Sequence, residues 1–91
     1  MKKMQSHIED IYLNKDSKRS EAENIWWLME ETGELLRALR KGSDQEIKEE
    51  FADTLAWLMT IASNRGIDLE DAFWERYKSG CSKCNCKPCK C

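Results

Sequence analysis

The chain has 91 residues, a length that allows one domain and buries only about 60 to 65% of the unfolded surface without a partner. The 15 Lys and Arg residues nearly balance 17 Asp and Glu residues, so the net charge of −2 gives no general reason to expect nucleic acid or an anionic membrane as a partner. No segment approaches the roughly 18 apolar residues of a membrane span, and the first residues are polar, unlike a signal peptide. We therefore predict a cytoplasmic protein.

Helix signals begin near the N-terminus, and strand signals are nearly absent from the whole chain. A first helix is predicted over about residues 3–13. Ser20 and Glu23 have the spacing of a capping box, which opens a second helix. This helix runs to Lys41, and Gly42 is placed to end it.

The next two helices carry similar signals. Ser43 and Glu46 form a second capping box, and the helix that they open ends just before Gly66. Asp68 can then cap a last helix over residues 69–77.

The connection between the second and third helices is so short that they must lie antiparallel, as a hairpin. The only proline is Pro88, so no proline interrupts the helices before the tail. We predict one all-α domain over residues 1–79. Residues 80–91 have no apolar period and hold all five cysteines, which predicts a Cys-rich appendix outside the core.

Each central helix carries an apolar stripe at the helical period of about 100° per residue. Such a stripe predicts a face that packs in the core. The stripes consist of Ile25, Leu28, Met29, Thr32, Leu35, Leu36 and Leu39 in the second helix, and Ile47, Phe51, Leu55, Leu58 and Ala62 in the third.

A second stripe on each of these helices carries carboxylates. Folding the hairpin brings Glu34 opposite Glu50, and Glu31 opposite Asp53. Solvated helices often carry acids, yet none of these four has Lys or Arg four residues later. Carboxylates that gather on a face covered by other parts of the protein need protons or a cation. A set of ligands that are all oxygen atoms suits a hard ion. We predict that the four bind Mg²⁺, or alternatively Mn²⁺.

Two strings on this hairpin match a known signature. Residues 27–35 read Trp-Leu-Met-Glu-Glu-Thr-Gly-Glu-Leu, and residues 50–57 read Glu-Phe-Ala-Asp-Thr-Leu-Ala-Trp. They resemble the MazG-like family of all-α nucleoside triphosphate pyrophosphohydrolases, whose signature is Glu-Glu-x-x-Glu, a variable spacer and Glu-x-x-Asp. The similarity continues through residues 66–72 and covers most of residues 20–78.

The resemblance implies hydrolysis of a nucleoside triphosphate between the α- and β-phosphates, giving a nucleoside monophosphate and pyrophosphate. It implies Mg²⁺ bound by the same four carboxylates. It also implies a homodimer or dimer of dimers, in which neighbouring subunits complete a four-helix bundle. In such a reaction a further carboxylate takes a proton from the attacking water. Glu30 or Glu49 is predicted as that base, and each can equally be a surface acid.

Other residues have two readings. Arg76 and Lys78 stand where the family tends to place basic residues that meet phosphates, although the helix dipole also favours cations at a solvated helix end. Trp27 and Trp57, which the hairpin brings close together, can stack on a base or pack between subunits. The Asn that the family commonly has after the basic position is missing, because residues 79–81 begin the tail.

The tail has five cysteines, one more than a tetrahedral Zn²⁺ site requires. The predicted ligands are Cys81, Cys84, Cys86 and Cys89. Only Asn85 separates the two Cys-x-x-Cys pairs, which is shorter than in most structural zinc sites. A disordered reduced tail and a redox pair are the alternatives.

Two other functions fit the sequence. Phosphoribosyl-ATP pyrophosphohydrolase of histidine synthesis shares the helical carboxylate hairpin, although its usual second motif differs from residues 51–57. A non-enzymatic helical dimerisation module, whose Cys tail binds a soft metal or a redox partner, is the other alternative.

Overall fold

Four helices make up the fold, in the order α1 (Lys2–Asp16), α2 (Glu21–Lys41), α3 (Asp44–Asn64) and α4 (Leu69–Tyr77). The computed structural model describes residues 1–16 and 18–91, apart from the side chains of Leu13 and Asp16. These residues form no strand, so the all-α prediction is confirmed. None of the described helices has the length and apolar character needed to cross a membrane.

Both predicted capping boxes are present. The N–H of Glu23 donates to the Ser20 hydroxyl at 3.2 Å, and the N–H of Ser20 donates back to the Glu23 carboxylate at 3.2 Å. Ser43 and Glu46 make the same reciprocal pair at the start of α3. Each box satisfies two backbone donors that the helix itself leaves unpaired, which explains why α2 and α3 begin where predicted.

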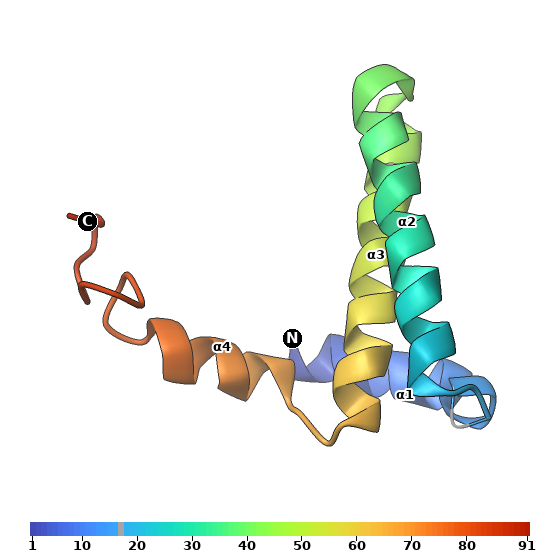
Figure 1. The fold of residues 1–91 in the computed structure, drawn as a ribbon, viewed down its shortest axis with the longest axis horizontal. Coiled ribbons are helices and arrows are strands. Elements are labelled where there is room, and N and C mark those ends of the chain that lie inside the picture. Colours follow the sequence, from blue (N-terminus) through green and yellow to red (C-terminus); the bar gives the residue numbers. More distant parts are fainter. Residues whose placement is uncertain (17) are drawn as a thin grey trace.

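α2 and α3 lie side by side as an antiparallel hairpin (Figure 1). At the turn the N–H of Gly42 donates to the Ala38 carbonyl at 2.7 Å. A Cβ at Gly42 would stand 2.8 Å from that same oxygen, so a larger residue would force the turn apart. At the open end of the hairpin, the Arg65 guanidinium pairs with the Glu21 carboxylate.

α1 crosses the open end of the hairpin, and α4 runs away from it toward the tail (Figure 1). Gln5 is only 5% exposed and joins these elements. Its Nε2 donates to the Ser63 hydroxyl at 3.0 Å and to the Ile67 carbonyl at 2.8 Å, and its Oε1 accepts from the N–H of Leu69 at 2.9 Å. α1 is longer at its C-terminal end than predicted, because no capping signal marks its limits in the sequence.

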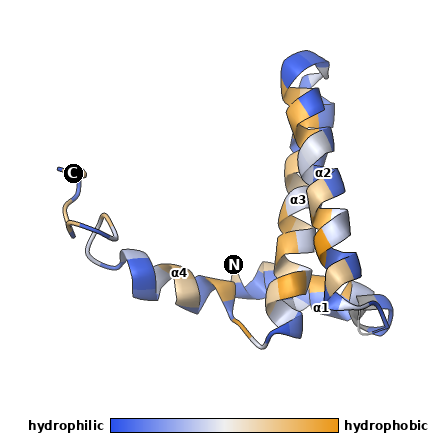
Figure 2. Ribbon diagram, in the orientation of Figure 1, coloured by the Kyte–Doolittle hydropathy of each residue, from blue (hydrophilic) through white to orange (hydrophobic). Residues whose placement is uncertain are grey.

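The apolar stripes that were predicted as core are largely exposed in the single chain. Met29 is 67% exposed, Leu36 57% and Phe51 53%. In Figure 2, apolar positions recur between hydrophilic ones along both helices of the hairpin. The prediction of a core on these stripes is wrong for one chain except at Ala62, because α2 and α3 pack mainly through their other faces. The buried apolar side chains among the described residues are Ala38, Met59 and Ala62.

Candidate active site

Three carboxyl groups meet between the two helices of the hairpin. Oxygen atoms of Glu31, Glu50 and Asp53 all lie within 4.8 Å of one another. Glu31 comes from α2, while the other two stand three residues apart on α3 and therefore share one face of that helix. The hairpin thus brings together three of the four predicted metal ligands, and we call them the carboxylate cluster.

The fourth predicted ligand, Glu34, lies outside this cluster. It is exposed, one turn further along α2, and lines a groove near the hairpin turn together with Glu50 and Glu46. Its charge still acts on the cluster, since it contributes to a raised pKa of Glu31. Glu50 faces both places and so connects Glu34 with the other two carboxylates.

Two oxygen atoms in the cluster have no donor. Oε2 of Glu31 and Oε2 of Glu50 are buried and make no hydrogen bond within the described residues. The pKa of Glu31 is raised to about 7, first by burial and then by a hydrogen bond with Glu50 and the charges of Glu34, Asp53 and Glu50. A buried carboxylate without a donor is costly, so the site must take up either a proton or a cation.

The donor set fits a hard divalent cation such as Mg²⁺. All of its atoms are carboxylate oxygens, and two of them lack any other partner. Asp53 is exposed, so the cluster opens to solvent on one side. An open side suits Mg²⁺, which keeps several water molecules and binds substrate phosphates directly.

A cavity of about 340 Å³ opens beside the cluster. Two acidic and two cationic side chains share it, together with two aromatic rings. Carboxylates that can hold a cation, next to positively charged side chains, are an arrangement that suits a phosphate-bearing ligand. The lining residues are Tyr12, Lys15, Arg19, Glu31, Asp53, Ala56, Trp57 and Thr60.

Arg19 is held in place by two contacts. Its guanidinium lies 4.9 Å from the centroid of the Trp57 ring, and its Nε donates to Oδ1 of Asn24 at 2.9 Å. Asn24 is 1% exposed, so this anchor is itself fixed within the fold. Sequence reasoning missed Arg19 and Lys15, because neither belongs to a motif and only the path of α1 across the hairpin brings them to the cavity.

The two tryptophans of the carboxylate stripes stack on each other, with ring centroids 6.0 Å apart and planes 14° from parallel. They lie close together as predicted. Trp57 lines the cavity beside the cluster, whereas Trp27 lines a different, shallow pocket with Trp26 and Ala22. Within one chain, Trp57 is therefore the better placed of the two to contact a ligand at the cluster.

The remaining predicted residues do not line the cavity. Glu30 and Glu49 are exposed, and Oε2 of Glu49 accepts a bond of 3.3 Å from its neighbour Gln45. Arg76 and Lys78 are exposed at the far end of α4, which leads away from the hairpin (Figure 1). Within a single chain these two cations do not approach the carboxylate cluster.

The cysteine tail gathers four thiols, but not the predicted four. The sulfur atoms of Cys81, Cys84, Cys89 and Cys91 lie within 4.8 Å of one another. Cys86 stands outside this group, and its thiol donates to the Cys84 carbonyl at 3.3 Å. The structure therefore has Cys91 where the sequence predicted Cys86.

The fold and the carboxylate cluster define an all-α protein with gathered carboxylates between two antiparallel helices. A family model described as the MazG nucleotide pyrophosphohydrolase domain matches residues 19–82, which include α2, α3 and α4. The chain belongs to this MazG family. The resemblance predicted from the two motifs is confirmed, and membership supports nucleotide pyrophosphohydrolysis as the general activity.

Proposed function

We propose that the chain is a Mg²⁺-dependent hydrolase that splits a ribo- or deoxyribonucleoside triphosphate into a nucleoside monophosphate and pyrophosphate. The observation that carries this proposal is the pair of buried, unpartnered oxygens on Glu31 and Glu50, beside a cavity that also holds Lys15 and Arg19. The same space thus offers carboxylate ligands for a hard cation and positively charged side chains for phosphate oxygens.

Glu31, Glu50 and Asp53 would hold the metal, and Glu34 would join them directly or through water from the next turn of α2. When bound, Mg²⁺ neutralises phosphate oxygens and supplies an activated water for in-line attack. The hairpin contributes rigid positions, since each ligand stands on a long helix fixed by a capping box.

Lys15 and Arg19 would bind phosphate oxygens, because charge-assisted hydrogen bonds from cations at the cavity wall fix a triphosphate against the metal. Tyr12 and Trp57 supply apolar surface for the base or the sugar. Trp27 stacks on Trp57 and would help to keep the Trp57 ring in place at the cavity.

The proposed enzyme is a homodimer or a dimer of dimers. The exposed apolar stripes run along both helices of the hairpin, and a second copy of the chain presents the same stripes. Joining two hairpins through them would complete a four-helix bundle and add the core that a chain of 91 residues lacks. Arg76 and Lys78 would then meet phosphate only across the subunit boundary.

The proton acceptor for the attacking water remains a prediction. Glu30 and Glu49 flank cluster residues in sequence, and both are exposed. Substituting each by Gln in turn identifies the base. The variant that lacks the base should lose about 100-fold or more in activity, while the other variant should change little.

A screen of nucleotides with and without Mg²⁺ tests the proposed reaction. We expect nucleoside monophosphate and pyrophosphate from at least one triphosphate, modified bases included, and no product without a divalent ion. Turnover of phosphoribosyl-ATP alone would instead assign the chain to histidine synthesis. Absence of pyrophosphate release from every nucleotide would overturn the proposal in favour of a non-enzymatic module.

A further inference from the structure

The four gathered thiols of the tail have the spacing of a tetrahedral metal site. Sulfur atoms of Cys81 and Cys91 lie 3.7 Å apart, and all four lie within 4.8 Å of one another. In a tetrahedral site with Zn–S bonds of about 2.3 Å, neighbouring sulfurs stand about 3.8 Å apart. A disulfide would require about 2.05 Å, and all five cysteines are free thiols.

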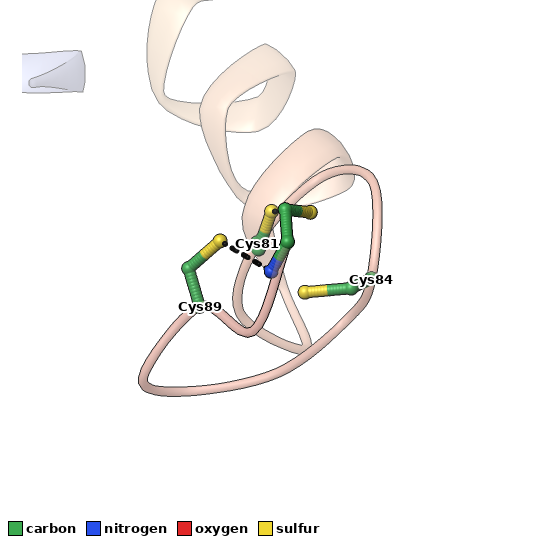
Figure 3. Close-up of side chains that lie close together, drawn as sticks. Cys81, Cys84 and Cys89 are labelled. Atoms are coloured by element: carbon green, nitrogen blue, oxygen red, sulfur yellow. Dashed lines mark hydrogen bonds between the residues drawn. The ribbon is translucent and has the colours of Figure 1, made fainter.

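The tail backbone points donors at three of these sulfurs. Such N–H groups stabilise thiolate charge and orient the ligands around a metal. In Figure 3 the sulfurs of Cys81, Cys84 and Cys89 point into the space that the loop encloses, and the dashed line marks the bond to Cys89. The bonds run from Lys83 to Cys81 at 3.5 Å, from Lys90 to Cys84 at 3.4 Å, and from Cys91 to Cys89 at 3.4 Å.

The loop is closed by its own backbone. The N–H of Cys81 donates to the Cys86 carbonyl at 2.9 Å, and the Cys81 carbonyl accepts from Asn85 at 2.7 Å. Asn85 has φ of 58°, in the left-handed region that Asn tolerates well. Gly80 has φ of 120°, and a Cβ there would stand 2.5 Å from the Cys86 carbonyl oxygen. The chain reversal between the ligands is therefore built into these residues.

We propose that the tail is a structural Zn²⁺ site whose ligands are Cys81, Cys84, Cys89 and Cys91, and that Cys86 is not a ligand. The ligand pairs then become Cys-x-x-Cys and Cys-x-Cys, separated by residues 85–88 instead of by a single residue. This separation is closer to that of most structural zinc sites than the single residue between the pairs of the predicted set.

Soft thiolate donors favour Zn²⁺ over the hard ion that suits the carboxylate cluster. Each ligand thiol loses its proton to solvent on binding, and four thiolates with one Zn²⁺ leave a local charge of about −2. Three lysines interleaved with the cysteines, Lys83, Lys87 and Lys90, offset that charge. The tail stands at the end of α4, away from the hairpin (Figure 1), so the ion would hold the tail closed and take no part in hydrolysis.

Zinc content of the full chain tests the proposal, with Cys86→Ser as the matched control for Cys91→Ser. We expect about one Zn²⁺ per chain in the parent and in Cys86→Ser. In competition with a chelating dye, Cys91→Ser should bind zinc at least tenfold more weakly than the parent. In the zinc-loaded parent, a thiol reagent should modify one cysteine quickly. With Cys86→Ser, that fast reaction should disappear.

Co²⁺ in place of Zn²⁺ should give the strong thiolate absorption bands of a tetrahedral four-sulfur site in the parent and in Cys86→Ser. A parent that binds no zinc, that holds iron in its place, or that forms disulfides under reducing conditions would overturn the proposal. Equal loss of zinc in Cys86→Ser and Cys91→Ser would also overturn it. Glu50→Gln should keep its zinc, so failure of this inference is separable from failure of the proposed hydrolase function.

Discussion

Glu31 and Glu50 show at the residue scale how the hairpin creates a need for a proton or a cation. Each places one buried oxygen where no described group donates to it, and their charges oppose each other across the helix interface. From acids that lack a cation four residues later, the sequence predicted four converging carboxylates, with Glu34 opposite Glu50 and Glu31 opposite Asp53. It could not predict that Glu34 would be left outside, since that depends on the rotation of α2 about its own axis.

The pH dependence of stability follows from Glu31. Its pKa rises from an ordinary 4.5 to about 7 in the fold, so the stability that Glu31 contributes to the metal-free protein is fully present below about pH 4.5 and is lost as the pH rises through about 7. Mg²⁺ should therefore raise the thermal midpoint more at about pH 8 than at about pH 5.5. Thermal unfolding at both pH values measures this.

Glu31→Gln is the control for this prediction, because it removes the titrating group while keeping its shape. The variant should lose most of the difference between the two pH values. An equal stabilisation by Mg²⁺ at both pH values in the parent would contradict the prediction.

Arg19 and Lys15 bring positive charge to the cavity beside the cluster. A charge-assisted hydrogen bond contributes about 1.5 to 3 kcal/mol, so Arg19→Ala should raise KM for a triphosphate by about 10- to 100-fold. Lys3→Ala, an exposed cation elsewhere on α1, should leave KM unchanged. Steady-state kinetics would contradict the assignment if both variants behaved alike.

At the scale of elements, the start signals were the most informative part of the sequence. Ser20 and Ser43 placed the beginnings of α2 and α3 correctly, and Asp68 did so for α4. The same signals said nothing about which face of each helix packs inward. The helix period defined two stripes, and the exposure of Met29 and Phe51 shows that the more apolar stripe is not the one buried within the chain.

Ser43→Ala should destabilise the hairpin, because it removes the acceptor for the N–H of Glu46 at the start of α3. Loss of such a cap costs about 1 kcal/mol, which for a domain of this size lowers the thermal midpoint by about 4 to 8 °C. Circular dichroism on heating measures the change. Ser79→Ala, at an exposed position after α4, should melt with the parent, and an equal drop in both would contradict a capping role.

At the scale of the whole molecule, the buried apolar side chains among the described residues are few, which supports the proposal that a second copy of the chain completes the core. The predicted need for a partner came from the chain length and from the resemblance to the MazG-like family. The exposed apolar positions along both helices of the hairpin are the proposed contact surface for that partner (Figure 2).

Replacing Met29 and Leu36 together by Glu should break the proposed assembly, because it places charges on the stripe that a second copy would cover. Sedimentation equilibrium should show a dimer or larger species for the parent and a shift to monomer for the double variant. Lys48→Glu, an exposed charge change on α3, should assemble as the parent does. A monomeric parent at tens of micromolar would contradict the proposed bundle.

Mg²⁺-dependent pyrophosphate release by Asp53→Asn and Glu50→Gln, set against the parent, is the most direct measurement of whether the carboxylate cluster is a catalytic metal site. Both substitutions keep the side-chain shape and remove one negative ligand, so each should lower kcat/KM by at least 100-fold, with Mg²⁺ at higher concentration restoring part of it. Glu75→Gln, an exposed acid on α4, should retain parent activity. Parent-level release by either cluster variant would contradict the account.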